Sequence, residues 1–158
     1  MEPDMLRRCV WEEMLTADMR ASYFAELVGH YLKLDKWLRV ATLLAASGTV
    51  GTALSQWSEG VRLAVPIVAT GVSFWLLISQ FGSMARDASD LHSGWSTVKR
   101  DYERLWGALS SPDAEEQYSQ IYDRAEVLSK SGTKFPNKTK RLGYWLDQAA
   151  RMATARYA

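Results

Sequence analysis

The pattern of apolar and polar positions divides the chain into two uncharged apolar runs and the amphipathic segments that flank them. The first run covers residues 40–58 and the second covers residues 63–85, with a short polar break between them. Because a helix rises ~1.5 Å per residue, either run is long enough as a helix to cross a hydrocarbon core of ~30 Å. The pattern therefore predicts two membrane spans, about residues 37–57 and 63–85, joined as a helical hairpin.

The alternative is a hairpin buried inside a larger helical protein. A chain of 158 residues is short for wrapping two such helices in protein on all sides, which favours the membrane. The predicted fold class is an all-α membrane protein, with a two-span hairpin and long antiparallel cytoplasmic helical arms that form a small bundle.

The segments on either side of the hairpin share a coiled-coil spacing. Apolar or small residues recur at alternating steps of three and four, from Val10 to Tyr31 and again from Ala88 to Leu109. A hairpin forces its flanking arms to be neighbours, so we expect the two arms to pair, although partner docking by the first seam is the alternative. The residues chosen to represent this arm seam are Phe24, Val28, Tyr31, Leu91, Trp95, Val98 and Tyr102.

Beyond the second arm, Ser111-Pro112-Asp113 predicts a helix start, with Ser111 as N-cap, and Gly132 predicts the end of that helix. The remaining tail is basic and amphipathic. It could lie on a membrane surface, dock a partner, or pack as a fourth helix of the bundle. The expected divisions of the chain are 1–36 (first arm), 37–85 (hairpin), 86–131 (cytoplasmic helical hairpin) and 132–158 (basic C-terminal helix).

Basic and tryptophan side chains bracket the predicted spans. Lys and Arg favour the cytoplasmic side of a membrane, and Trp favours the headgroup level. This bias predicts a multi-pass membrane protein with both termini cytoplasmic. The expected interface anchors are Lys36, Trp37, Arg39, Trp57 and Arg86.

Small and hydroxyl-bearing residues recur at four-residue steps in the first span, which lets helix backbones approach closely. They form either a packing face or the lining of a pore between assembled copies, so the expected partners are the lipid bilayer and further copies of the chain. The residues of this face are Ser47, Gly48, Gly51, Thr52 and Ser55.

Composition and motifs mainly exclude classes of function and kinds of site. The net charge is +1, and no motif for binding nucleic acid accompanies the basic tail, so nucleic acid is not an expected partner. The single cysteine, Cys9, excludes an intrachain disulfide. We find no phosphate loop, nucleophile elbow or metal-ligand spacing, so we expect no catalytic residues, no cofactor, no metal and no enzyme activity.

The chain also resembles a known family in three stretches. These are the arm entry from Arg20 to Tyr31 with its aromatic and leucine positions, the small-residue run 41–54, and the stretch from Leu91 to Trp106. They are similar to SLATT domains, the two-transmembrane effectors of prokaryotic nucleotide-signalling conflict systems. The resemblance implies an oligomeric effector in antiphage defence that permeabilises the inner membrane when triggered, with a regulatory partner protein from a sensing or nucleotide-signalling system.

Two other functions are consistent with the same pattern. The first alternative is a membrane-anchored scaffold that recruits a partner through its cytoplasmic helical bundle. The second is a subunit of a channel or transporter, although the absence of an ionisable residue at mid-depth in either run argues against proton coupling.

Overall fold

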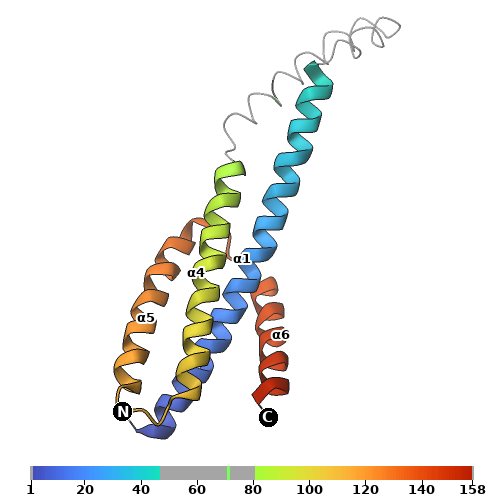
Figure 1. Cartoon of the computed structure of the whole chain (residues 1–158). Helices are drawn as coiled ribbons and strands as arrows, with labels where there is room; N and C mark the ends of the chain where they lie inside the picture. The colour runs from blue at the N-terminus through green and yellow to red at the C-terminus, as the bar shows by residue number, and fades with distance from the viewer. Residues whose placement is uncertain (1, 47–70, 72–80, 158) are drawn as a thin grey trace, which may run out of the picture. The chain divides into compact units, whose positions relative to one another are not determined.

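The computed structural model describes residues 2–46, 71 and 81–157, and the elements it describes are helices (Figure 1). They are α1 (Pro3–Ala46), α4 (Phe81–Gly107), α5 (Ala114–Ser131), the short 3-10 helix η2 (Gly132–Lys134) and α6 (Thr139–Tyr157).

The chain divides into two compact units. We call the first the bundle, which comprises Met1–Leu27 and Asp87–Ala158, and the second the middle unit, Val28–Arg86. The first division lies nine residues before the expected one at 36/37, and α1 continues through both positions without a break. The second lies within one residue of the expected boundary at 85/86.

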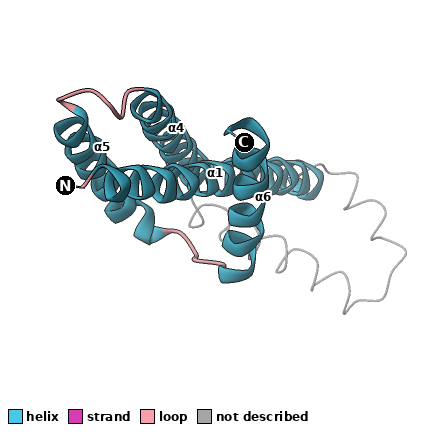
Figure 2. Cartoon of the chain, turned by 90° about the horizontal axis from the view of Figure 1, so that it is seen from below, coloured by secondary structure: helices cyan, strands magenta, loops and turns pink. Residues whose placement is uncertain are grey.

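Within the bundle, α4 lies beside the first part of α1, and α5 and α6 lie on different sides of α1 (Figures 1 and 2). Seen from below, α6 crosses α1 at an inclination and does not run alongside it (Figure 2). A hydrogen bond and an ion pair join α1 to α4: His92 Nδ1 lies 2.8 Å from the carbonyl oxygen of Ala21, and Lys99 Nζ lies 2.8 Å from Asp18 Oδ1.

The bundle core follows from the three-four spacing of its helices. Small side chains on α1, such as Ala17 and Ala21, leave room for large ones on α4, such as Trp95 and Tyr102, and all four are buried. This alternation of small and large residues lets facing helices pack closely. From α5, Ile121 and other apolar residues at the same spacing complete the core.

Gly132 ends α5 at a point where α1 lies close to it. A Cβ at Gly132 would lie 3.3 Å from Phe24 Cζ, a tight contact, so glycine suits the close approach of α1 at this position. The chain continues from Gly132 into η2 with ordinary right-handed angles. At the other end, the N-cap is Asp113 and not the expected Ser111, because Ser111 and Pro112 belong to the turn before the helix.

In the middle unit, α1 and α4 also contact each other. The rings of Tyr31 and Phe81 stack with centroids 6.4 Å apart. Asp35 forms an ion pair with Arg39 one turn later on α1.

The structure corrects the expected membrane fold. Among the residues that the structure describes, no helix combines the length and the apolar composition needed to cross a membrane. This finding contradicts the two-span fold class, the multi-pass inner-membrane localisation and the pore-forming description. Those expectations relied on the apolar runs, on the residues that bracket them and on the resemblance to SLATT domains. Most of both runs falls on residues 47–70 and 72–80, which lie outside the described residues.

Candidate docking faces of the helical bundle

The predicted arm-seam residues lie mostly in the interior. Phe24, Leu91, Trp95, Val98 and Tyr102 are buried in the bundle, whereas Val28 and Tyr31 belong to the middle unit. There Tyr31 is buried and Val28 is half-buried. The seam therefore packs within the chain, so its side chains do not form an open docking face.

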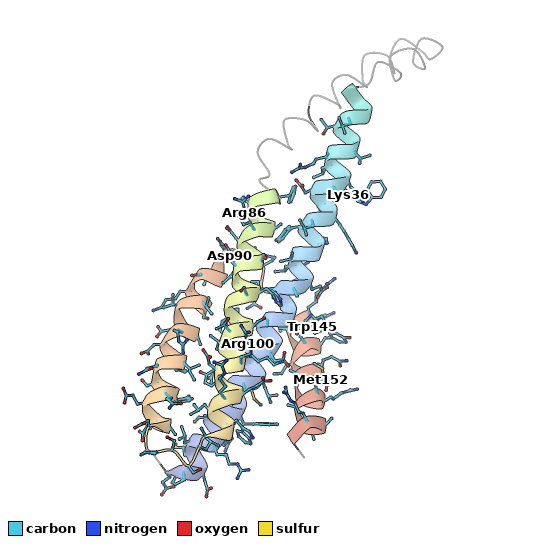
Figure 3. The ribbon with its side chains drawn as sticks, in the orientation of Figure 1. Lys36, Arg86, Asp90, Arg100, Trp145 and Met152 are labelled. Carbon is cyan, nitrogen blue, oxygen red and sulfur yellow. The ribbon has the colours of Figure 1, made fainter. Side chains whose placement is uncertain are left out.

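The other predicted residues fall elsewhere. Lys36 lies on α1 and Arg86 on α4, both exposed in the middle unit (Figure 3). Trp37 is 72% exposed, and Arg39 pairs with Asp35. The remaining anchor and the whole small-residue face lie outside the described residues: Trp57, Ser47, Gly48, Gly51, Thr52 and Ser55.

The basic tail packs as the fourth helix of the bundle. Trp145 of α6 donates a hydrogen bond from Nε1 to Glu26 Oε2 of α1 at 2.9 Å, and Arg141 forms an ion pair with the same carboxylate (Figure 3). At the far end of α6, Arg156 Nη1 lies 2.9 Å from Glu103 Oε1 of α4. Two carboxylates thus fix both ends of α6, and part of its positive charge is neutralised within the bundle.

A shallow groove lies between α4 and α5, with a volume of about 500 Å³. A Cβ at Gly94 would lie 2.7 Å from Leu128 Cδ2, so this glycine allows α5 to approach α4 closely. At the rim, Val127 is 63% exposed, and Asp123 stands one helical turn before it. Asp123 forms no ion pair within the described part of the chain. The groove lining is Gly94, Thr97, Val98, Asp123, Arg124, Val127 and Leu128.

The outer face of α6 carries a positive charge beside an aromatic ring, whereas the groove rim carries a negative charge beside an apolar side chain. Tyr144 is 57% exposed, and its ring meets Trp145 edge-on with centroids 5.2 Å apart. Lys140 precedes it by one turn and is exposed. Within the described ranges, Lys140 makes no ion pair. Because the buried Ala149 and Ala153 mark the inner face, helical periodicity places Lys140 and Tyr144 on the opposite side of α6.

Burial shifts the pKa values of several polar groups that pack within the bundle. Burial raises the pKa of the Glu13 carboxyl, and the Arg20 guanidinium opposes this shift. The pKa of the Tyr118 hydroxyl is raised to about 12, first by burial and then by the nearby Cys9 and Glu13. Burial likewise raises the pKa of Tyr102.

In the described ranges, no group of histidine, cysteine and acidic residues could hold a metal ion. The groove was missed at the level of sequence. Its available signal was Gly94 inside a helix together with the exposed pair Asp123 and Val127, but the helix that faces them could not be assigned without the fold.

Comparison with known proteins gives no relative: no family model, no curated protein and no solved structure matches this chain. The resemblance to SLATT domains, and the effector role it implies, stay predictions.

Proposed function

We propose that the bundle is an assembly module, through which copies of this chain join head to tail. The observation that carries the proposal is the match between two exposed faces one helical turn long. Asp123 and Val127 are spaced by four residues on α5, and Lys140 and Tyr144 are spaced by four residues on α6.

Each pair places a charge and an apolar group one turn apart on a helix. When α6 of one copy lies along the groove of another, Lys140 can face Asp123 while Tyr144 covers Val127. Tyrosine is favoured at the centre of protein interfaces, and opposite charges at the rim set the register. The open groove between α4 and α5 can accept the tyrosine ring beside Val127.

The two faces differ, so the contact is heterologous. Such a contact leaves one groove and one α6 free at the ends and continues to a ring or a filament. Because each face is only one helical turn long, the contact belongs to the small interfaces, below about 1,200 Å² in total. Weak, concentration-dependent association is expected for such interfaces. This function requires no catalytic residue.

Substitution of either face tests the proposal. We expect Val127→Asp and Tyr144→Asp each to weaken association by at least about tenfold, because each buries a charge at the contact. Sedimentation velocity of the purified protein over a concentration series measures the effect. The matched control is Met5→Asp, since Met5 is 59% exposed and lies on neither face. Association that is unchanged in both face variants, or a wild-type protein that stays monomeric at millimolar concentration, would refute the proposal.

A further inference from the structure

A second feature of the bundle is a cavity of about 340 Å³ where α1, the end of α5, the loop after η2 and the start of α6 meet. This volume is at the lower end of the ~300–1,000 Å³ typical of small-molecule sites. Its walls are partly aromatic and partly polar. The lining comprises Met19, Arg20, Tyr23, Phe24, Ser129, Gly132, Thr133, Phe135, Pro136, Asn137 and Leu142.

Arg20 is the charged group of this cavity. Its guanidinium lies over the buried Trp95 ring, 4.7 Å from the centroid, and Nη1 donates to Ser129 Oγ at 2.8 Å. Within the described part of the chain, no carboxylate forms an ion pair with it. Buried or half-buried arginines are ordinarily paired, because an unpaired charge away from water is costly. The desolvation caused by burial also lowers the pKa of Arg20, with Glu13 acting against the shift.

The position of Arg20 is fixed by its neighbours. The ring of Trp95 supports one face of the guanidinium, and Ser129 holds one edge, so the remaining N–H donors are held in a defined orientation. The loop wall is fixed as well, because the Tyr23 hydroxyl donates to the carbonyl oxygen of Pro136. Phe24 and Phe135, which also line the cavity, meet edge to face with centroids 5.6 Å apart.

From this arrangement we infer that the cavity is a binding site for a small organic anion with a flat apolar body. The guanidinium fork of Arg20 takes the carboxylate or phosphate group, for which its planar donors are suited. The apolar body lies against Phe24, Phe135 and Leu142. Asn137, which makes no hydrogen bond within the described residues, is available for a further polar contact.

Isothermal titration calorimetry with three probes of the same aromatic body tests this site. Benzoate and phenyl phosphate carry the two candidate anions, and benzyl alcohol is the neutral control. We expect one-to-one binding of at least one anion, at least about tenfold tighter than benzyl alcohol. Preference for benzoate would identify a carboxylate ligand, and preference for phenyl phosphate a phosphate ligand.

Two variants locate the binding. Arg20→Gln should weaken anion binding by at least about tenfold, and Leu142→Trp should abolish it by filling the cavity while leaving Arg20 in place. Arg8→Gln is the matched control, since Arg8 is an exposed arginine of the same helix that pairs with Glu12. The inference is overturned if neither anion binds at millimolar concentration, if benzyl alcohol binds equally well, or if Leu142→Trp binds like the wild type.

Discussion

At the scale of single residues, the three-four spacing of the arms carried the correct information about the interior. The positions from Val10 to Phe24 and from Leu91 to Tyr102 are buried because a repeat of this kind forms one continuous stripe on a helix. Spacing alone could not show which polar atoms would stay without a partner. Trp95 Nε1 and the Tyr102 hydroxyl are buried without a hydrogen-bond partner in the described structure.

Replacing the Tyr102 hydroxyl tests this description of the core. Tyr102→Phe removes a buried group that has no partner, so we expect the free energy of unfolding to rise by about 1 kcal/mol. Tyr23→Phe is the matched comparison, because the Tyr23 hydroxyl does have an acceptor. We expect this variant to lower the free energy of unfolding by about 1 kcal/mol. Urea denaturation followed by circular dichroism measures both. A loss of stability in Tyr102→Phe would mean that the hydroxyl has a partner after all.

At the scale of elements, the helices of the flanking segments were predictable, and the role of the tail was not. Its charge and amphipathic pattern fit a membrane surface, a partner or the bundle equally well. Packing in the bundle is favoured by two distant carboxylates, Glu26 and Glu103, which meet Arg141 and Arg156 only once α1 and α4 are paired. Sequence periodicity contains no information about such contacts between helices.

The anchor at Glu26 gives a prediction for α6. Because this carboxylate binds both Trp145 and Arg141, Glu26→Ala should loosen the start of α6 and speed amide exchange there by about tenfold or more. Hydrogen–deuterium exchange with mass spectrometry resolves the peptides of α6 from those of α5. Glu12→Ala, which removes an exposed carboxylate of the same helix, is the control. Equal exchange of α6 in both variants would show that Glu26 does not hold it.

At the scale of the whole molecule, the prediction of a two-span membrane protein was wrong because it rested on the length and apolarity of two runs. No described helix meets those conditions. What remains is a bundle with two unlike exposed faces, the groove of α4 and α5 and the outer side of α6. Neither face was visible in the sequence, since each is defined by what the fold leaves uncovered.

The most direct test of head-to-tail assembly is to mix two variants that each lack one face. Val127→Asp retains the outer face of α6, and Tyr144→Asp retains the groove, so neither should associate alone. Sedimentation velocity of an equimolar mixture should show a one-to-one dimer that does not grow further, because only one intact contact can form. A mixture that stays monomeric while the wild type associates, or dimers in either variant alone, would contradict the account.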